Sequence, residues 1–195
     1  MVLLFSFRSS VADWYYVPTG SMEPTIQVGD RVVVDKSAYS LELPFTDVVV
    51  AKTGNINRGD IVIIDSNAAD TRLIKRVVAI EGDKVKLENN VLFINGEKAT
   101  LSVKGHNLYS EQILGQTRTI ALNPLPSPAK NFNLITVPRG HVLAMGDNRN
   151  NSVDSRYYGF IPIEEIQGKA NSVAFSLDPD DMYLPRKDRL FTSLQ

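Results

Sequence analysis

Residues 58–64 read Arg-Gly-Asp-Ile-Val-Ile-Ile, and residues 73–83 read Leu-Ile-Lys-Arg-Val-Val-Ala-Ile-Glu-Gly-Asp. Each stretch is a short apolar run bounded by Gly and Asp, which is the pattern of a β-strand between turns. Similar runs stand at residues 31–35 and 48–50, whereas signals for helices are weak along the whole chain. These runs predict a mostly β fold with short strands and frequent turns.

The strongest turn signal is Asn95-Gly96, which separates the apolar run at residues 91–94 from the residues that begin at Glu97. Both central positions of a two-residue type I′ turn need positive φ angles, which Asn and Gly adopt readily. The sequence therefore predicts a β-hairpin at this point.

The dipeptide Gly-Asp recurs beside apolar runs at residues 29–30, 59–60, 82–83 and 146–147. We expect each Gly to adopt a positive φ angle and each Asp to accept hydrogen bonds from nearby backbone amides. On this interpretation the recurrence is a turn device and carries no information about catalysis.

Composition excludes several classes of protein. The net charge is −1 without a long basic run, so no nucleic-acid partner is expected. The absence of cysteine excludes disulfides, a thiolate nucleophile and a cysteine-ligated metal. The two histidines, His106 and His141, form no HExxH pattern, so a metal site is not expected.

Three regions differ from the strand-rich remainder. Residues 100–137 are rich in Ser, Thr, Asn and Pro, which indicates an insert of loops and short strands. The tail from Asp178 is polar and is expected to be a loosely held extension. Met1–Phe7 is apolar but far shorter than the roughly 20 residues that span a bilayer. It is either an N-terminal strand or frayed end, or the stub of a membrane anchor.

A candidate nucleophile, Ser21, lies within Pro-Thr-Gly-Ser-Met-Glu-Pro-Thr at residues 18–25. Gly20 lets the backbone approach a substrate closely, and the two prolines stiffen the segment. A serine in such a segment is most often an ordinary turn residue. To act as a nucleophile it needs a base that removes its proton.

Lys75 is the better candidate base, because neither histidine has a recognisable partner. Its neighbours along the chain are mostly apolar, so a strand here would exclude water. Burial, together with a nearby cation such as Arg76, would lower the pKa of Lys75 from about 10.4. The alternative is a solvated strand lysine whose stem lies on apolar surface.

A third polar cluster spans residues 145–159, between two apolar runs. Ser152 could hydrogen-bond a lysine amine and orient it. Four charged residues of the segment could form charge-assisted pairs: Asp147, Arg149, Asp154 and Arg156. The alternative is a polar surface loop tied to the core at both ends.

Three elements, in order along the chain, resemble the type I signal peptidase family. They are Gly20–Thr25, Lys75–Asp83 and Gly146–Arg156, and the strand at Gly29–Val34 matches as well. The resemblance extends over about residues 15 to 170. Ala79 and Glu81 stand where many relatives carry Gly and Pro, but Lys75 and Gly82-Asp83 remain.

The resemblance implies the role of each site residue. Ser21 resembles the nucleophile and Lys75 the general base of a mechanism that passes through an acyl-enzyme. The Ser21 N–H and the Thr19 hydroxyl resemble the oxyanion hole, and Ser152 the residue that orients the lysine. A supporting polar shell is implied for Arg76, Asp147, Asp154 and Arg156. The walls of pockets for small residues, as in Ala-x-Ala, are implied for Tyr15, Val17, Met22, Ile26 and Ile74.

The family also implies a division of the chain. The expected parts are a remnant of, or junction to, a membrane anchor (1–14), a β catalytic core (15–90 and 138–177), an inserted β-rich subdomain (91–137) and a C-terminal extension (178–195). The expected function is removal of N-terminal signal peptides from exported preproteins after a small-x-small site, without metal or cofactor. The expected location is the bacterial inner membrane, in contact with the lipid bilayer, with the catalytic domain on the periplasmic face.

Three alternatives remain. A peptidase that processes pilins or conjugation proteins would share the chemistry and the residues. A self-cleaving repressor would need an Ala-Gly or Cys-Gly cleavage dipeptide upstream of Ser21, and none is present. A non-catalytic β module that binds extended peptides at a sheet edge would not need both Ser21 and Lys75.

Overall fold

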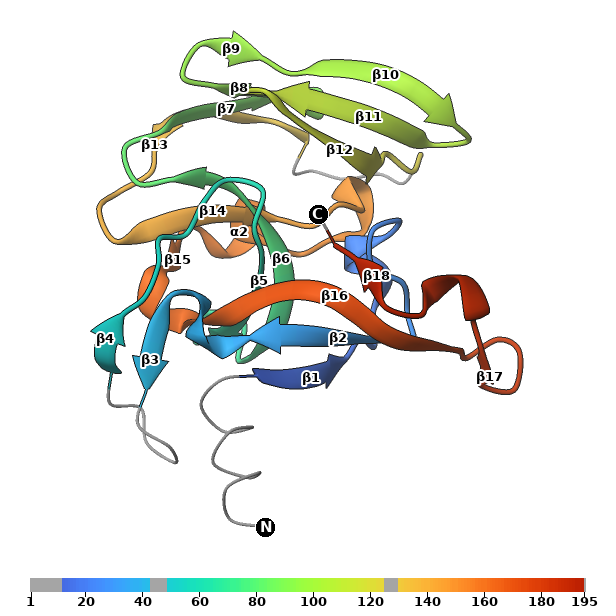
Figure 1. The fold of residues 1–195 in the computed structure, drawn as a ribbon. Helices are drawn as coiled ribbons and strands as arrows, with labels where there is room; N and C mark the ends of the chain where they lie inside the picture. The colour runs from blue at the N-terminus through green and yellow to red at the C-terminus, as the bar shows by residue number, and fades with distance from the viewer. Residues whose placement is uncertain (1–11, 43–48, 125–129, 195) are drawn as a thin grey trace.

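The computed structural model describes residues 12–42, 49–124 and 130–194. Strands dominate these residues, which confirms the prediction of a mostly β fold (Figure 1). The apolar segment Met1–Phe7 lies outside the described residues. Among the described residues, no helix is long and apolar enough to cross a membrane.

The largest sheet has nine strands and forms the body of the molecule (Figure 1). Its seven-strand path follows the order β1 (Ala12–Tyr16), β2 (Asp30–Asp35), β16 (Ile166–Asp178), β5 (Ile61–Ser66), β6 (Thr71–Ile80), β14 (His141–Met145) and β15 (Ile161–Pro162). Two short strands, β17 (Leu184–Pro185) and β18 (Thr192–Ser193), pair with β16. The apolar runs predicted within residues 31–35, 58–64 and 73–83 correspond to β2, β5 and β6. A separate two-stranded sheet joins β3 (Ser40–Glu42) to β4 (Val49–Lys52).

The inserted part of the chain forms two further sheets, drawn at the top of Figure 1. One contains β13 (Phe132–Thr136), β7 (Lys84–Glu88), β8 (Val91–Ile94) and β9 (Glu97–Lys98), and the other contains β10 (Thr100–Gly105), β11 (Leu108–Ile113) and β12 (Gln116–Ala121). Because β7 pairs with β8 and β13, the boundary expected at residue 91 falls inside the first of these sheets. The insert is also more regular than its composition suggested.

The insert shares a hydrophobic core with the main sheet. Val85 and Leu92 of the insert belong to one buried cluster with Val78, Leu143 and Met145 of β6 and β14. A second buried cluster packs the segment after β1 against the other end of the main sheet, and includes Val17, Met22, Ile26, Val32, Ile63 and Val173. The first cluster therefore couples the insert to the core, and the second fixes the segment that carries Ser21.

The predicted hairpin is confirmed. Ile94 pairs with Glu97, and the two residues between them have positive φ angles, 53° at Asn95 and 87° at Gly96.

Three of the four Gly-Asp pairs are the predicted turn device. Gly29, Gly59 and Gly82 have φ angles of 94°, 91° and 83°. The aspartate that follows each of them accepts a hydrogen bond from the backbone amide three residues earlier, that of Gln27, Asn57 or Ile80. For Gly146-Asp147 the prediction is wrong, because Gly146 lacks a positive φ angle and Asp147 binds side chains instead.

Candidate active site

Ser21 lies in the 3-10 helix η1 (Gly20–Met22), the next element after β1. The buried side chain of Met22 belongs to the second core cluster and holds this turn against the sheet. Asn148 fixes the backbone from the other side. Its amide N–H donates to Ser21 O at 3.1 Å, and its side-chain Nδ2 donates to Gly20 O at 3.0 Å.

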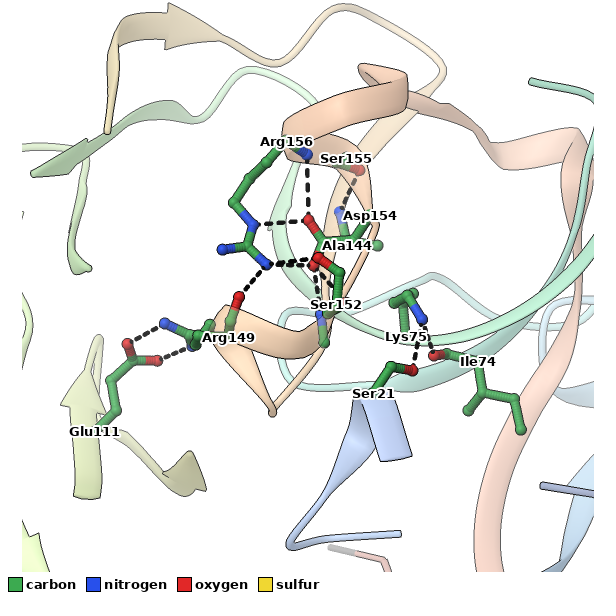
Figure 2. A network of polar contacts seen from close by, with 11 residues as sticks. Ser21, Ile74, Lys75, Glu111, Ala144, Arg149, Ser152, Asp154, Ser155 and Arg156 are labelled. Carbon is green, nitrogen blue, oxygen red and sulfur yellow. Dashed lines mark hydrogen bonds and ion pairs between the residues drawn. The ribbon is translucent and has the colours of Figure 1, made fainter. Parts of the chain in front are cut away.

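Lys75 reaches Ser21 from the middle of β6, where it pairs with Val62 of β5. Its Nζ donates hydrogen bonds to Ser21 Oγ at 2.9 Å and to Ile74 O at 3.0 Å (Figure 2). Only 4% of Lys75 is exposed. The two residues that the sequence singled out as nucleophile and base therefore lie within hydrogen-bonding distance, in a setting that excludes most water.

Burial is the main reason that the pKa of Lys75 is lowered, to about 8. Asp154 opposes the shift, Arg156 adds to it and Asp147 opposes it more weakly. The cation that lowers the pKa is thus Arg156 rather than the expected Arg76. Arg76 lies one residue further along β6, on the opposite face, and its charge is paired with Asp147 at 2.9 and 2.7 Å.

Asp154 is the centre of the polar loop at residues 146–156. Its carboxylate accepts hydrogen bonds from Ser152 Oγ at 2.8 Å and Gly146 N at 2.9 Å, and from the guanidinium of Arg156 at 2.8 Å to each oxygen (Figure 2). Ser152 was expected to hydrogen-bond Lys75. In the structure its hydroxyl donates to Asp154, and the hydrogen bonds of Lys75 Nζ go to Ser21 and Ile74.

Gly146 lies where the polar loop meets the segment that carries Ser21. A Cβ atom at this position would collide with the side chain of Ser152 and with the carbonyl oxygen of Ser21. The absence of a side chain therefore allows the loop to approach the nucleophile closely. Next to it, Asp147 joins two further elements, because it pairs with Arg76 of β6 and accepts a hydrogen bond from Thr25 Oγ1 at 2.6 Å.

Sequence reasoning missed Glu111, a fully buried carboxylate on β11 of the insert. Arg149 of the polar loop donates to both of its oxygens, at 2.8 and 2.6 Å (Figure 2). Arg118 donates to one of them at 2.5 Å. Burial alone would raise the pKa of Glu111, but Arg149 and Arg118 outweigh it and lower the pKa to about 2. Arg149 thus pairs with the insert rather than with an aspartate of its own loop.

A cavity of about 350 Å³ opens beside Ser21 and Lys75. Four of the five residues expected to form the pocket wall line it: Tyr15, Val17, Met22 and Ile74. Ile26, the fifth, does not line it, because its side chain is fully buried in the core behind the pocket. The cavity is also lined by Thr19, Tyr16, Pro18, Thr71, Arg72 and Leu73. Thr19, the residue expected to complete the oxyanion hole, is exposed and lines this cavity.

No cluster of three or more His, Asp or Glu side chains within the described ranges is placed to hold a metal ion. The polar groups next to Ser21 and Lys75 are instead committed to one another. The arrangement of a hydroxyl, a buried amine and an adjoining apolar cavity is suited to nucleophilic attack on a bound acyl group.

The profile of the family described as signal peptidase, peptidase S26, matches residues 1–175. The chain is similar to signal peptidase I of Pseudomonas aeruginosa, with 33% identity over 97% of this chain and 74% of that protein. It is also similar to signal peptidase IB of Staphylococcus aureus, with 34% identity over 87% of this chain and 81% of that protein. A crystal structure of a signal peptidase I from Enterococcus faecalis V583 has 27% identity and a TM-score of 0.40, covering 59% of this chain and 96% of that one.

Proposed function

The chain belongs to the signal peptidase family, peptidase S26, and we propose that it cleaves with Ser21 as nucleophile and Lys75 as general base. It is a serine endopeptidase that removes signal peptides from preproteins. The observation that carries the assignment of the two residues is the 2.9 Å hydrogen bond between Lys75 Nζ and Ser21 Oγ. Such contact is the geometric requirement for a base that activates a nucleophile.

In the proposed mechanism, neutral Lys75 takes the proton of Ser21, and Oγ attacks the scissile carbonyl. The Ser21 N–H and the Thr19 hydroxyl stabilise the oxyanion that develops. Lys75 then gives its proton to the leaving amine, which departs from the acyl-enzyme. The Lys75 amine, neutral again, then activates the water that hydrolyses the acyl-enzyme and releases the signal peptide. A pKa near 8 makes both proton transfers accessible near neutral pH.

Small residues at the first and third positions before the cut would enter the cavity beside Ser21. The apolar residues of its wall, among them Val17, Met22 and Ile74, favour aliphatic side chains such as Ala. The aromatic ring of Tyr15 narrows the cavity and is itself covered by the Arg72 guanidinium, 4.7 Å from the ring centre. We assign Ile26 a supporting role behind this wall rather than contact with substrate.

The polar loop would hold Lys75 in a defined electrostatic field. Asp154 positions Ser152 and Arg156, and both Asp154 and Arg156 act on the pKa of Lys75. We propose that Ser152 influences the base through Asp154 in the arrangement described here. Arg76 and Asp147 would act as a brace between β6 and the loop.

Membrane association and a periplasmic orientation of the catalytic domain are part of the proposal. The family acts on exported preproteins, and large apolar side chains are exposed where β1, β2 and β16 lie side by side. Trp14 is 56% exposed, and Tyr16 and Phe175 are both exposed on strands that flank β2, opposite Arg31. Aromatic side chains of this kind favour the membrane interface. Flotation with phospholipid vesicles tests the association, and recovery of the protein only in the lipid-free fraction contradicts it.

The central experiment is cleavage of a preprotein with an Ala-x-Ala junction, in detergent. We expect the wild type to cut after the second Ala, and Ser21→Ala and Lys75→Ala to lose at least about 100-fold in rate. The exposed residues Ser102 and Lys84 supply matched controls, because their replacement by Ala removes the same groups outside the site. Full activity of Lys75→Ala would show that another group is the base, even if the family function stands.

A further inference from the structure

A second hollow, of about 540 Å³, begins where the pocket for the signal peptide ends. The pocket is lined by residues of the serine segment up to Met22, and this second hollow by residues from Glu23 onward. Its walls come from four parts of the chain: the turn after Ser21, the insert near Leu108 and Asn123, the polar loop at Asn148, and the C-terminal extension near Asp180.

The hollow is tied directly to the nucleophile. Asn148, one of its lining residues, donates from its backbone to Ser21 O and from its side chain to Gly20 O. Asn123, on the facing wall, donates to the side chain of Asn148 at 2.9 Å. A substrate that fills the pocket up to Ser21 must continue beyond it. The hollow is a candidate for that space, because its lining begins at Glu23 and includes Asn148, which binds the backbone of the serine segment.

The hollow carries negative charge that the protein does not neutralise. The carboxylate of Glu23 is folded over Gly20, with Cδ 2.9 Å from where a Cβ on that glycine would lie. Among the described residues, none donates a hydrogen bond to this carboxylate or forms an ion pair with it. Asp180 is a second, exposed carboxylate of the lining.

The lining cation, Arg186, is already committed. Its guanidinium pairs with Asp178 at 2.9 Å and donates to Val28 O at 2.8 Å and Ser176 Oγ at 3.1 Å. It therefore holds the C-terminal extension in place and does not offset Glu23. A cationic side chain of a bound peptide would meet an unpaired carboxylate in a partly enclosed space, where opposite charges attract and like charges repel.

We propose that this hollow binds the first residues after the scissile bond, which become the N-terminus of the mature protein, and that Glu23 favours a basic over an acidic side chain there. The inference rests on the proposed function, because it takes Ser21 as the point of cleavage. It makes Glu23 a specificity residue of the protease, separate from the residues that select the signal peptide.

The test uses peptides that are identical up to the cut and carry Lys, Gln or Glu at the first, second or third position after it. We expect kcat/KM of the wild-type protein to favour Lys over Glu by about 5–10-fold at one of these positions in low salt, since charges that are partly screened interact by about 1 kcal/mol. Glu23→Gln should reduce this ratio to about twofold or less. Raising the salt concentration should reduce the ratio of the wild type.

Glu164→Gln is the matched control, because Glu164 is an exposed carboxylate that does not line the hollow. This variant should keep the wild-type ratio. Equal rates for the Lys and Glu peptides in the wild type would overturn the inference, and so would an unchanged ratio in a folded Glu23→Gln protein. If Glu23→Gln does not fold, the salt dependence of the wild-type Lys-to-Glu ratio is the test, and a ratio that does not fall with rising salt would overturn the inference. Failure to cut any of the peptides would count against the proposed function instead.

Discussion

Gly82-Asp83 and Gly146-Asp147 are the same dipeptide beside similar apolar strands, yet they perform different tasks. Gly82 has a φ angle of 83° and open space around it, and Asp83 binds the backbone amide of Ile80 and the guanidinium of Arg58. Gly146 is confined between Ser152 and Ser21, and Asp147 joins Arg76 to Thr25.

A Gly-Asp pair that forms a turn and one that forms part of a functional site therefore cannot be distinguished by their amino-acid sequence alone. At the first pair, glycine is needed for a backbone conformation. At the second pair, it is needed because two other segments occupy the space of a side chain. Only the second requirement depends on residues that are distant in the chain.

The largest contrast is expected when each glycine is replaced by Ala. Gly146→Ala should lower the cleavage rate more than 100-fold, because Ser21 and Ser152 must move apart and small misplacements of reacting groups are costly. It should also reduce the free energy of unfolding by about 3 kcal/mol through overpacking. Gly82→Ala should cost about 1 kcal/mol for the positive φ angle and leave the cleavage rate within about twofold.

Cleavage assays and urea unfolding of both variants provide the measurement. A Gly146→Ala protein that cleaves at the wild-type rate would contradict the close approach described here. A Gly82→Ala protein that loses activity would show that the turn also affects the site.

The next contrast is expected between the two aspartates. Asp147→Asn leaves the Arg76 guanidinium buried without its carboxylate, which should reduce the free energy of unfolding by about 3–5 kcal/mol. Asp83→Asn leaves Arg58 with access to water, since 31% of its side chain is exposed. We expect a loss of about 1–2 kcal/mol there. Denaturant titration checks both values, and equal losses would remove the distinction between the two sites.

The smallest contrast concerns pH. Lys75 must be neutral to act as a base, so kcat/KM should rise tenfold per pH unit and level off above about 8, the lowered pKa of Lys75. Because Asp147 raises the pKa of Lys75, Asp147→Asn should move the midpoint to lower pH. Asp83→Asn should leave the midpoint where it is. A wild-type profile that stays flat until about pH 10 would contradict the assignment of the base.

The same shift predicts the sign of a stability effect. Lys75 has a lower pKa in the folded protein, so between pH 8 and 10.5 the unfolded chain binds more protons and stability gains with rising pH from this group. Below pH 8 the cost of burying the ammonium is present in full. The burial that lets Lys75 act as a base near neutral pH therefore lowers the free energy of unfolding there.

Features with a local cause could be predicted from the sequence. The hairpin at Asn95-Gly96 and the three turn aspartates depend on residues within a few positions of one another. β5 and β6 were visible because their apolar residues are contiguous and bounded by turns. β16 was not predicted, because its apolar residues alternate irregularly with Gln167, Lys169 and Asn171, and its pairing with β2 shifts register twice.

Features with a distant cause could not be predicted in this way. Glu111 stands in an ordinary polar strand, and its partner Arg149 lies 38 residues further on. Ile26 and Met22 are both apolar residues of the same short segment, and only the course of the backbone decides that Met22 borders the cavity and Ile26 does not. The resemblance to a family paired Ser21 with Lys75 as nucleophile and base. In the structure the two side chains lie within hydrogen-bonding distance.

The spacing of the contacts around Ser21 has a consequence for the order in which the enzyme is made. Ser21 and Lys75 are 54 residues apart, but Thr25 and Asp147 are 122 apart, and Gly20 and Asn148 are 128 apart. During synthesis the nucleophile and base emerge from the ribosome long before the loop that braces them. Contacts of such long range form late in folding. The nucleophile and the base are therefore braced only after residues 146–156 have been synthesised and folded against them.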